Sequence, residues 1–88
     1  MTLNKEELKN KIIYRSAYRG SKEMDILLSN FVKKVINHLD DQELMMLDEL
    51  INTDDENLFK FNKNLQTTVE IKENKISQLF KNFKLKDI

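Results

Sequence analysis

Gly20 is the only glycine in the chain, and the chain contains no proline. β-Hairpin turns depend on these two residue types, and phosphate-binding loops depend on closely spaced glycines. Their near absence excludes an all-β fold, a P-loop and a dinucleotide-binding fingerprint. The chain also has no cysteine and a single histidine, which excludes disulfides, thiolate metal sites and histidine-cluster metal sites. We therefore expect an all-α protein.

The length of 88 residues suffices for one small domain, so residues 1–88 are predicted to form a single helical domain with a frayed tail at about residues 84–88. Hydrophobic residues make up 40% of the chain and recur at helical spacing, which favours a globular protein over a disordered one. We expect a small five-helix bundle, four main helices plus one short helix, with a radius of gyration of about 12 Å. No apolar run is long enough for a membrane span, and the first 20 residues lack the pattern of a targeting segment.

Helix-start signals, in which a capping side chain is followed by carboxylates in the first turn, divide the chain into these five helices. The expected helices follow Asn4 (residues 5–18), Ser21 (22–39), Asp40 (41–52), the run Thr53, Asp54 and Asp55 (a short helix to about 61) and Thr67 with Glu70 (to about 83). The second helix is apolar most of the way round and should be the buried centre. Val69, Ile76, Leu79, Phe80 and Phe83 are expected to line the last helix. Gly20 is expected to end the first helix in a left-handed conformation.

Charge is balanced overall, with 15 basic and 15 acidic residues, but it is unevenly distributed. Residues 1–22 hold six bases against two acids, residues 23–59 hold ten acids against two lysines, and residues 60–88 hold seven lysines against three acids. One interpretation is a set of helices that attract one another within the bundle. The other is a bipolar surface that orients a protein partner. The sequence slightly favours the first.

No residue combination predicts catalysis or metal binding. His38 is the only imidazole, and its expected position near a helix C-terminus explains it better than a catalytic role. The pairs Asp40-Asp41 and Asp54-Asp55 lack the spacing of a calcium loop and suit helix capping. We therefore expect no enzyme activity, no catalytic residues, no metal site and no cofactor-binding residues.

Tyr14 and Tyr18 are four residues apart, as are Arg15 and Arg19, and both pairs precede the turn at Gly20. Aromatic and arginine side chains dominate the binding energy of protein interfaces, so this composition indicates a docking surface. The alternative is a structural salt bridge from an arginine to an acidic residue at the start of the second helix. The methionine pair Met45-Met46 is expected to fill the core rather than to form a binding groove.

The segment YRSAYRGSKEMDILLSNF, residues 14–31, resembles the signature of the SdhE family of succinate dehydrogenase assembly factors. Arg19-Gly20, Glu23 and Asp25 form its core, and the later segment HLDDQELMMLDELINTDDENLFKF extends the likeness to about residues 10–61. Family members commonly have a proline in the acidic turn and a tryptophan after the Leu-aromatic pair, where this chain has Glu56 and Phe61.

The resemblance implies a five-helix, non-enzymatic chaperone that binds the flavoprotein subunit of succinate dehydrogenase, and in some organisms of fumarate reductase. In that family the partner carries the FAD and supplies the histidine to which it becomes covalently attached. The matching positions imply a partner-binding surface of Arg15, Arg19, Gly20, Glu23 and Asp25. Glu23 is expected to interact either with Arg15 or Arg19 or with a cationic group on the partner.

The expected chain is a monomer when free, without tightly bound FAD. It would be cytoplasmic in a bacterium and would act in the mitochondrial matrix in a eukaryote after removal of a presequence. The alternative function is a helical interaction or regulatory module, including one that binds nucleic acid through the basic first helix. Neutral net charge argues against nucleic-acid binding in general, and steep salt dependence of binding would identify it.

Overall fold

A side-chain oxygen caps the N-terminus of every α-helix in the computed structural model, which describes residues 4–84. The helices are α1 (Lys5–Ala17), α2 (Lys22–Val35), α3 (Asp41–Ile51), α4 (Asp55–Asn62) and α5 (Lys75–Asn82), with a 3₁₀ turn at Ile36–His38 after α2. The predicted caps Asn4, Ser21 and Asp40 are correct, and the α4 cap Asp54 belongs to the predicted Asp54-Asp55 pair. The all-α fold with five helices is confirmed. None of the helices in this part of the chain is long and apolar enough to span a membrane.

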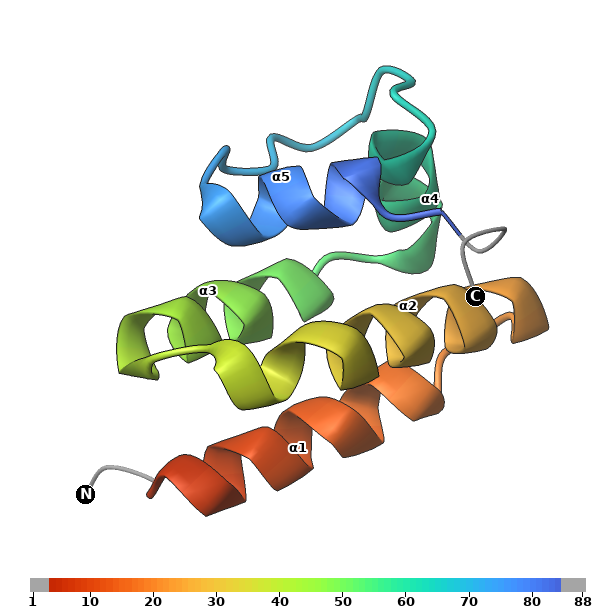
Figure 1. The fold of residues 1–88 in the computed structure, drawn as a ribbon. Coiled ribbons are helices and arrows are strands. Elements are labelled where there is room, and N and C mark those ends of the chain that lie inside the picture. Colours follow the sequence, from red (N-terminus) through yellow and green to blue (C-terminus); the bar gives the residue numbers. More distant parts are fainter. Residues whose placement is uncertain (1–3, 85–88) are drawn as a thin grey trace.

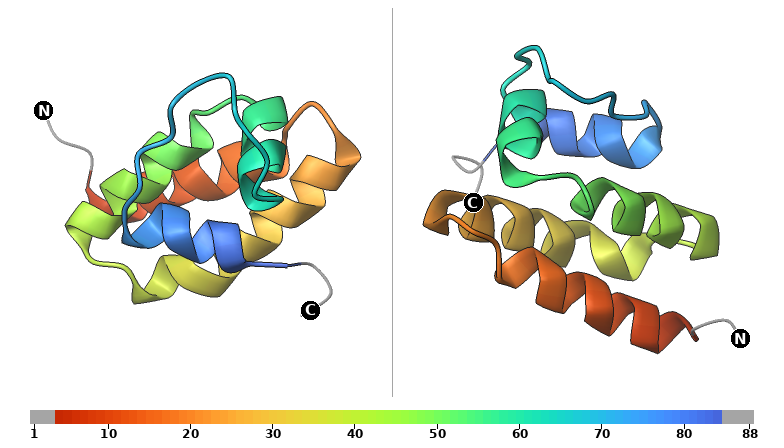
Figure 2. Two further views of the ribbon diagram at one scale, coloured as in Figure 1. Left: turned by 90° about the horizontal axis from the view of Figure 1, so that it is seen from above. Right: turned by 180° about the vertical axis from the view of Figure 1, so that it is seen from behind.

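The helices lie in three layers (Figure 1). α1 packs against one side of α2 and α3, while α4 and α5 cover the other side, as the view from behind also shows (Figure 2). The middle layer therefore holds the centre of the core, and the radius of gyration is 12.3 Å, as predicted. The largest fully buried apolar side chains come from all five helices: Ile12, Leu28, Phe31, Leu44, Leu47, Ile51, Leu58, Ile76 and Phe80.

The last helix begins later than the sequence predicted. Thr67 and Glu70 do not open it; instead Asn74 caps α5, and the Ser77 hydroxyl accepts from the Asn74 backbone N–H at 2.9 Å. Residues 63–74 form a non-helical linker in which the backbone N–H of Thr68 donates to the buried Asn57 of α4 at 2.7 Å. This link anchors the linker to α4, and Val69 is consequently half-exposed outside any helix.

The expected left-handed conformation of Gly20 is wrong. Among the described residues only Asn64 has a positive φ, of 61°, at the end of α4. The turn after α1 instead has side-chain partners: the backbone N–H groups of Arg19 and Gly20 donate to carboxylates of Asp25 and Asp55. These acceptors remove the need for a left-handed cap.

The end of the second helix and the C-terminal tail were also predicted from the sequence. α2 ends at Val35 rather than Leu39, because the chain tightens into the 3₁₀ turn that carries His38. Of the predicted frayed tail, residues 85–88 lie outside the described residues, whereas the Lys84 ammonium donates to the backbone carbonyls of Asn62 and Lys81.

Candidate functional site

The guanidinium of Arg19 clamps the end of α1 to the junction between α3 and α4. Its Nε donates to Oδ1 of Asp55 at 2.7 Å, and its two Nη atoms each donate to a backbone carbonyl, that of Ile51 and that of Thr53, at 2.8 Å. Carbonyls at the end of a helix have no helical donor, and the planar fork of arginine suits several acceptors at once. Because the side chain is only 11% exposed, Arg19 is engaged within the chain itself. Its predicted contact with a partner stays a prediction.

Gly20 is exposed in the turn between α1 and α2, next to Asp55 at the start of α4. Its N–H donates to Oδ2 of Asp55 at 2.9 Å, so one carboxylate holds both Arg19 and Gly20. A Cβ at Gly20 would lie 3.5 Å from that oxygen, which is an ordinary van der Waals contact. The glycine is therefore not required by the fold, and what it provides is a surface without a side chain.

Asp25 supports the turn through the backbone. Its carboxylate accepts a hydrogen bond from the Arg19 N–H, one turn into α2. The alternative of an arginine salt bridge to Glu23 or Asp25 is not formed among the described residues, where the ion pairs of Arg15 and Arg19 involve Asp48 and Asp55. Glu23 is exposed in the first turn of α2, and its carboxylate forms no hydrogen bond or ion pair within residues 4–84. Of the two interpretations of Glu23, a contact with a partner is the one left open.

The tyrosine pair predicted to mark a docking surface lies beside this turn. Tyr14 and Tyr18 are 65% and 71% exposed, and their ring centroids are 4.7 Å apart. Tyrosine side chains have few rotatable bonds and therefore lose little conformational entropy when a partner covers them. A hollow of about 370 Å³ next to them is also lined by Arg19, Gly20 and Asp55.

Two further hollows continue from this one along α2 and α4. One of about 410 Å³ contains Glu23, Asp55 and Phe59, and the next, of about 360 Å³, contains Glu23, Phe59 and Lys63. We call the exposed surface of Tyr14, Tyr18, Gly20, Glu23 and Phe59 the motif face. Asp55 and Phe59 were not among the predicted site residues. The adjacent Asp54-Asp55 pair was a signal for Asp55, since only Asp54 is needed as the α4 cap.

The guanidinium of Arg15 is directed toward α3. Its Nη1 lies 3.7 Å from Oδ1 of Asp48, and Lys11 Nζ lies 3.8 Å from the same oxygen. Lys5 of α1 pairs in the same way with Asp41 at 3.9 Å. The basic first helix is thus largely neutralised by acidic α3, as the first interpretation of the charge pattern predicted. Arg15 is half-buried and lines the edge of the tyrosine hollow, so its partner-binding role also stays a prediction.

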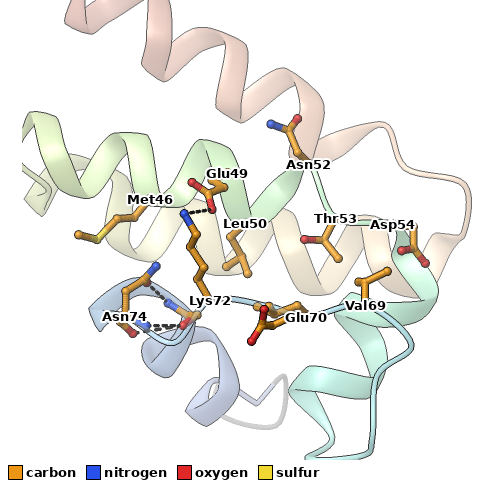
Figure 3. A pocket seen from close by; sticks show the side chains of 12 residues that line it. Met46, Glu49, Leu50, Asn52, Thr53, Asp54, Val69, Glu70, Lys72 and Asn74 are labelled. Atoms are coloured by element: carbon orange, nitrogen blue, oxygen red, sulfur yellow. Dashed lines mark hydrogen bonds and ion pairs between the residues drawn. The ribbon is translucent and has the colours of Figure 1, made fainter.

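A separate groove of about 510 Å³ lies between α3 and the linker (Figure 3). Met46 and Leu50 of α3 face Val69, Glu70 and Lys72 of the linker across it, and Lys72 pairs with Glu49 at 3.5 Å. None of the five predicted site residues lines this groove. Met46 packs against the core as expected, whereas Met45 is 67% exposed, so the core interpretation of the methionine pair is wrong for Met45.

Two carboxylates titrate below their ordinary range. The Lys75 ammonium, 2.7 Å away, lowers the pKa of Glu43, and the Glu43 carboxylate raises the pKa of Lys75 in return. Hydrogen bonds from the Asn57 side chain and backbone lower the pKa of Asp54. Both carboxylates cap helices, so these shifts belong to the fold. Within residues 4–84, no group of three histidine or acidic side chains converges on a metal-binding arrangement.

Comparison with known proteins identifies one family. The family model described as "Flavinator of succinate dehydrogenase" matches residues 10–84. The mitochondrial succinate dehydrogenase assembly factor 2 of Arabidopsis thaliana is 33% identical over 58 residues, which cover 66% of this chain and 31% of the plant protein. The corresponding proteins of Drosophila willistoni (assembly factor 2-A) and Danio rerio are 31% and 30% identical over 83% and 85% of this chain.

These relatives are longer proteins. The chain spans 48% of the Drosophila protein and 49% of the Danio protein, and less than a third of the Arabidopsis protein. No solved structure matches the chain. The resemblance found in the sequence is confirmed, and the family match extends beyond it, to residue 84.

Proposed function

The chain belongs to the family of succinate dehydrogenase flavinators, and from this membership we propose that it binds the flavoprotein subunit of succinate dehydrogenase and promotes covalent attachment of FAD to that subunit. The relatives are named as assembly factors of succinate dehydrogenase. The proposal adds the subunit, the motif face as the contact surface, and an action without catalysis by this chain. The FAD would be carried by the partner.

The motif face is supported by the different positions of the motif residues. Arg19, Asp25 and Asp55 fix the α1–α2 turn from inside, while Gly20 and Glu23 remain exposed. A turn held in this way presents a fixed backbone surface to a partner, and a rigid surface loses little entropy on binding.

The proposed mechanism is conformational. Binding energy at the motif face would restrict the flavoprotein to arrangements in which its flavin and its histidine are already close, which lowers the entropic part of the barrier. This mechanism requires no acid, base or nucleophile from this chain. It would operate in the mitochondrial matrix of a eukaryote, as the names of the relatives suggest, or in the cytoplasm of a bacterium.

The test measures covalent flavin on the cognate flavoprotein, by in-gel fluorescence after denaturation, in cells with and without this chain. We expect fluorescence to fall without the chain while the abundance of the flavoprotein is unchanged. Wild-type protein should restore the signal and Gly20→Arg should not. Gln42→Arg is a matched control, because it adds the same charge at an exposed position. Gln42 lies in the first turn of α3, whereas the motif lies at the other end of that helix. Unchanged covalent flavin in cells that lack the chain would overturn the proposal.

A further inference from the structure

Four lysines lie in or shortly after the last turns of α2, α4 and α5. Lys34, Lys63, Lys81 and Lys84, which we call the lysine patch, form none of the ion pairs found within residues 4–84. In contrast, the basic residues of α1 that face α3 and the lysines Lys72 and Lys75 all pair with acids. Lys22, Lys33 and Lys60 also form none of these ion pairs, so what sets the four lysines of the patch apart is that they lie together.

Shared neighbours bring the four lysines together. Lys34 lies over the ring of Phe83 at 5.5 Å, and the next residue is Lys84, whose ammonium donates to the carbonyls of Asn62 and Lys81. The ammonium of Lys81 lies 5.4 Å from the ring centroid of Phe61, and Phe61 directly precedes Asn62 in the chain. Lys63 follows Asn62 and shares a hollow with it.

The local sequence leaves these charges uncompensated. Residues 26–39, 57–69 and 74–84, which supply the patch and its surroundings, contain no aspartate or glutamate. Each lysine also lies in or next to the last turn of a helix, where a cation interacts favourably with the helix dipole. That effect explains why lysines are tolerated there, but it does not explain why these three segments contain no acid.

We propose that the lysine patch is a second contact surface for the flavoprotein partner, and that it binds a cluster of aspartate and glutamate side chains on that partner. The proposal rests on the proposed function. Distributed carboxylates fit better than a single phosphate group, because the four ammonium groups come from the ends of three different helices and have beside them, within residues 4–84, no free N–H groups of a helix N-terminus, which are the groups that bind phosphate. Lysines act as separate point charges, which suits an acidic protein surface.

The patch is continuous with the motif face. Lys63 and the motif-face residues Glu23 and Phe59 line the same hollow. A partner docked on Gly20 and Glu23 would therefore extend over Phe59 to Lys63 without crossing another element. The two surfaces carry opposite charge next to each other, which would fix the orientation of the partner as well as speed its approach.

The experiment compares matched charge neutralisations in binding to the purified flavoprotein subunit. Lys34→Gln/Lys63→Gln removes two charges from the patch, and Lys5→Gln/Lys72→Gln removes two from ion-paired positions on other faces. We expect the patch variant to weaken binding about fivefold to tenfold, mainly through slower association, and the control to change it less than twofold. The weakening should diminish as salt is raised, because added ions screen the charges. Thermal melts followed by circular dichroism check that both variants are folded.

The outcomes separate the two proposals. Binding of wild type with equal affinities for both variants would overturn the lysine patch and leave the proposed function standing. Failure of wild type to bind the flavoprotein would overturn the proposed function and with it this inference. A parallel titration uses a 20-nucleotide single-stranded DNA at 150 mM salt. Loss of DNA binding in the patch variant alone, with unchanged flavoprotein binding, would also overturn the inference in favour of a nucleic-acid site.

Discussion

Arg19 is bound to Asp55 through one oxygen of the carboxylate, and Gly20 is bound through the other. Oδ1 accepts from the Arg19 Nε at 2.7 Å, and Oδ2 accepts from the Gly20 N–H at 2.9 Å. The first residue of α4 thereby holds the turn between α1 and α2. Residues 36 positions apart in the chain are joined where the motif lies. Mutations at Arg19 and at Gly20 should therefore act through different physical causes, although the two residues are neighbours.

Arg19→Ala should destabilise the fold. The substitution removes the pair with Asp55 and leaves the carbonyls of Ile51 and Thr53 without their donors. We expect a loss of about 2–4 kcal/mol in the free energy of unfolding, measured by urea titration. Arg19→Lys should recover only part of it, because one ammonium cannot reach three acceptors held in a fork arrangement. A stable Arg19→Ala variant that still fails to bind the flavoprotein would show instead that the guanidinium contacts the partner directly.

Gly20 should tolerate a side chain as far as folding is concerned. Its φ is not positive and the site for a Cβ is 3.5 Å from the nearest oxygen of Asp55. Gly20→Ala and Gly20→Arg should both keep the helical circular dichroism spectrum and lie within about 1 kcal/mol of wild type. Gly20→Arg should nevertheless abolish binding, because its side chain would project from the exposed turn. Global unfolding of Gly20→Arg would assign Gly20 a purely structural role.

Glu23 and Asp41 form a matched pair for testing the motif. Both are exposed carboxylates in the first turn of a helix, so removing either costs a similar favourable interaction with the helix dipole. Glu23→Ala should weaken flavoprotein binding at least tenfold in a calorimetric titration, while Asp41→Ala should leave it within about twofold. Equal losses would remove the special status of Glu23.

The sequence predicted local features well because they depend on neighbouring residues. The caps Asn4, Ser21, Asp40 and Asp54 lie within a few residues of the amides they bind. The first three were predicted individually, and Asp54 as one of the pair Asp54-Asp55. The start of α5 was missed because Thr67-Glu70 and Asn74-Ser77 both resemble a cap, and the choice depends on the distant contact of Thr68 with Asn57.

The same reasoning explains the candidate site. The five predicted site residues come from a local motif, but the inward direction of Arg19 depends on Ile51, Thr53 and Asp55, which no local pattern connects with it. The conformation of Gly20 was mispredicted for the same reason, since a carboxylate from α4 satisfies its N–H.

Acid should destabilise the bundle through Asp54 and Glu43. In the folded chain the pKa of each lies below its ordinary value, because of Asn57 and Lys75 respectively. A lowered folded-state pKa means that the stabilisation is present above the unfolded-state pKa, near 4, and is lost as pH falls through the folded-state pKa. The urea midpoint should therefore be nearly constant from pH 7 to about pH 5 and should decrease below about pH 4.

The variant Asp54→Asn tests the source of that decrease. Asparagine still caps the helix but does not titrate, so the midpoint should fall less steeply between pH 4 and pH 2 than in wild type. The raised pKa of Lys75 has the opposite sign, and its contribution should be lost only as pH rises through that pKa, above the ordinary 10.5. An unchanged slope in Asp54→Asn would mean that other carboxylates dominate the acid transition.

Asn62 should be the polar residue on which the position of α5 depends. Its side chain is 1% exposed, and its Nδ2 donates to the carbonyls of Phe80 and Phe83 at 2.8 Å each. Asn62→Leu keeps the branched shape of the side chain but removes both hydrogen bonds. The carbonyl of Phe83 then loses its donor, whereas that of Phe80 still accepts from the Phe83 N–H, and the change should cost about 1–3 kcal/mol in unfolding free energy. Asn82→Leu is the matched control, because Asn82 is exposed and its amide donates only to the carbonyl of Gln78 within α5.

Hydrogen exchange locates the effect of Asn62→Leu. The backbone amides of α5 should lose protection, while those of α1, which packs on the opposite side of the middle layer, should keep it up to the limit set by global unfolding. Equal destabilisation by Asn62→Leu and Asn82→Leu would mean that apolar packing of Phe80 and Phe83 positions α5 without the amide. Selective loss in α5 would also displace Lys81 and Lys84, so flavoprotein binding should then fall together with the protection of α5 if the lysine patch is a contact surface.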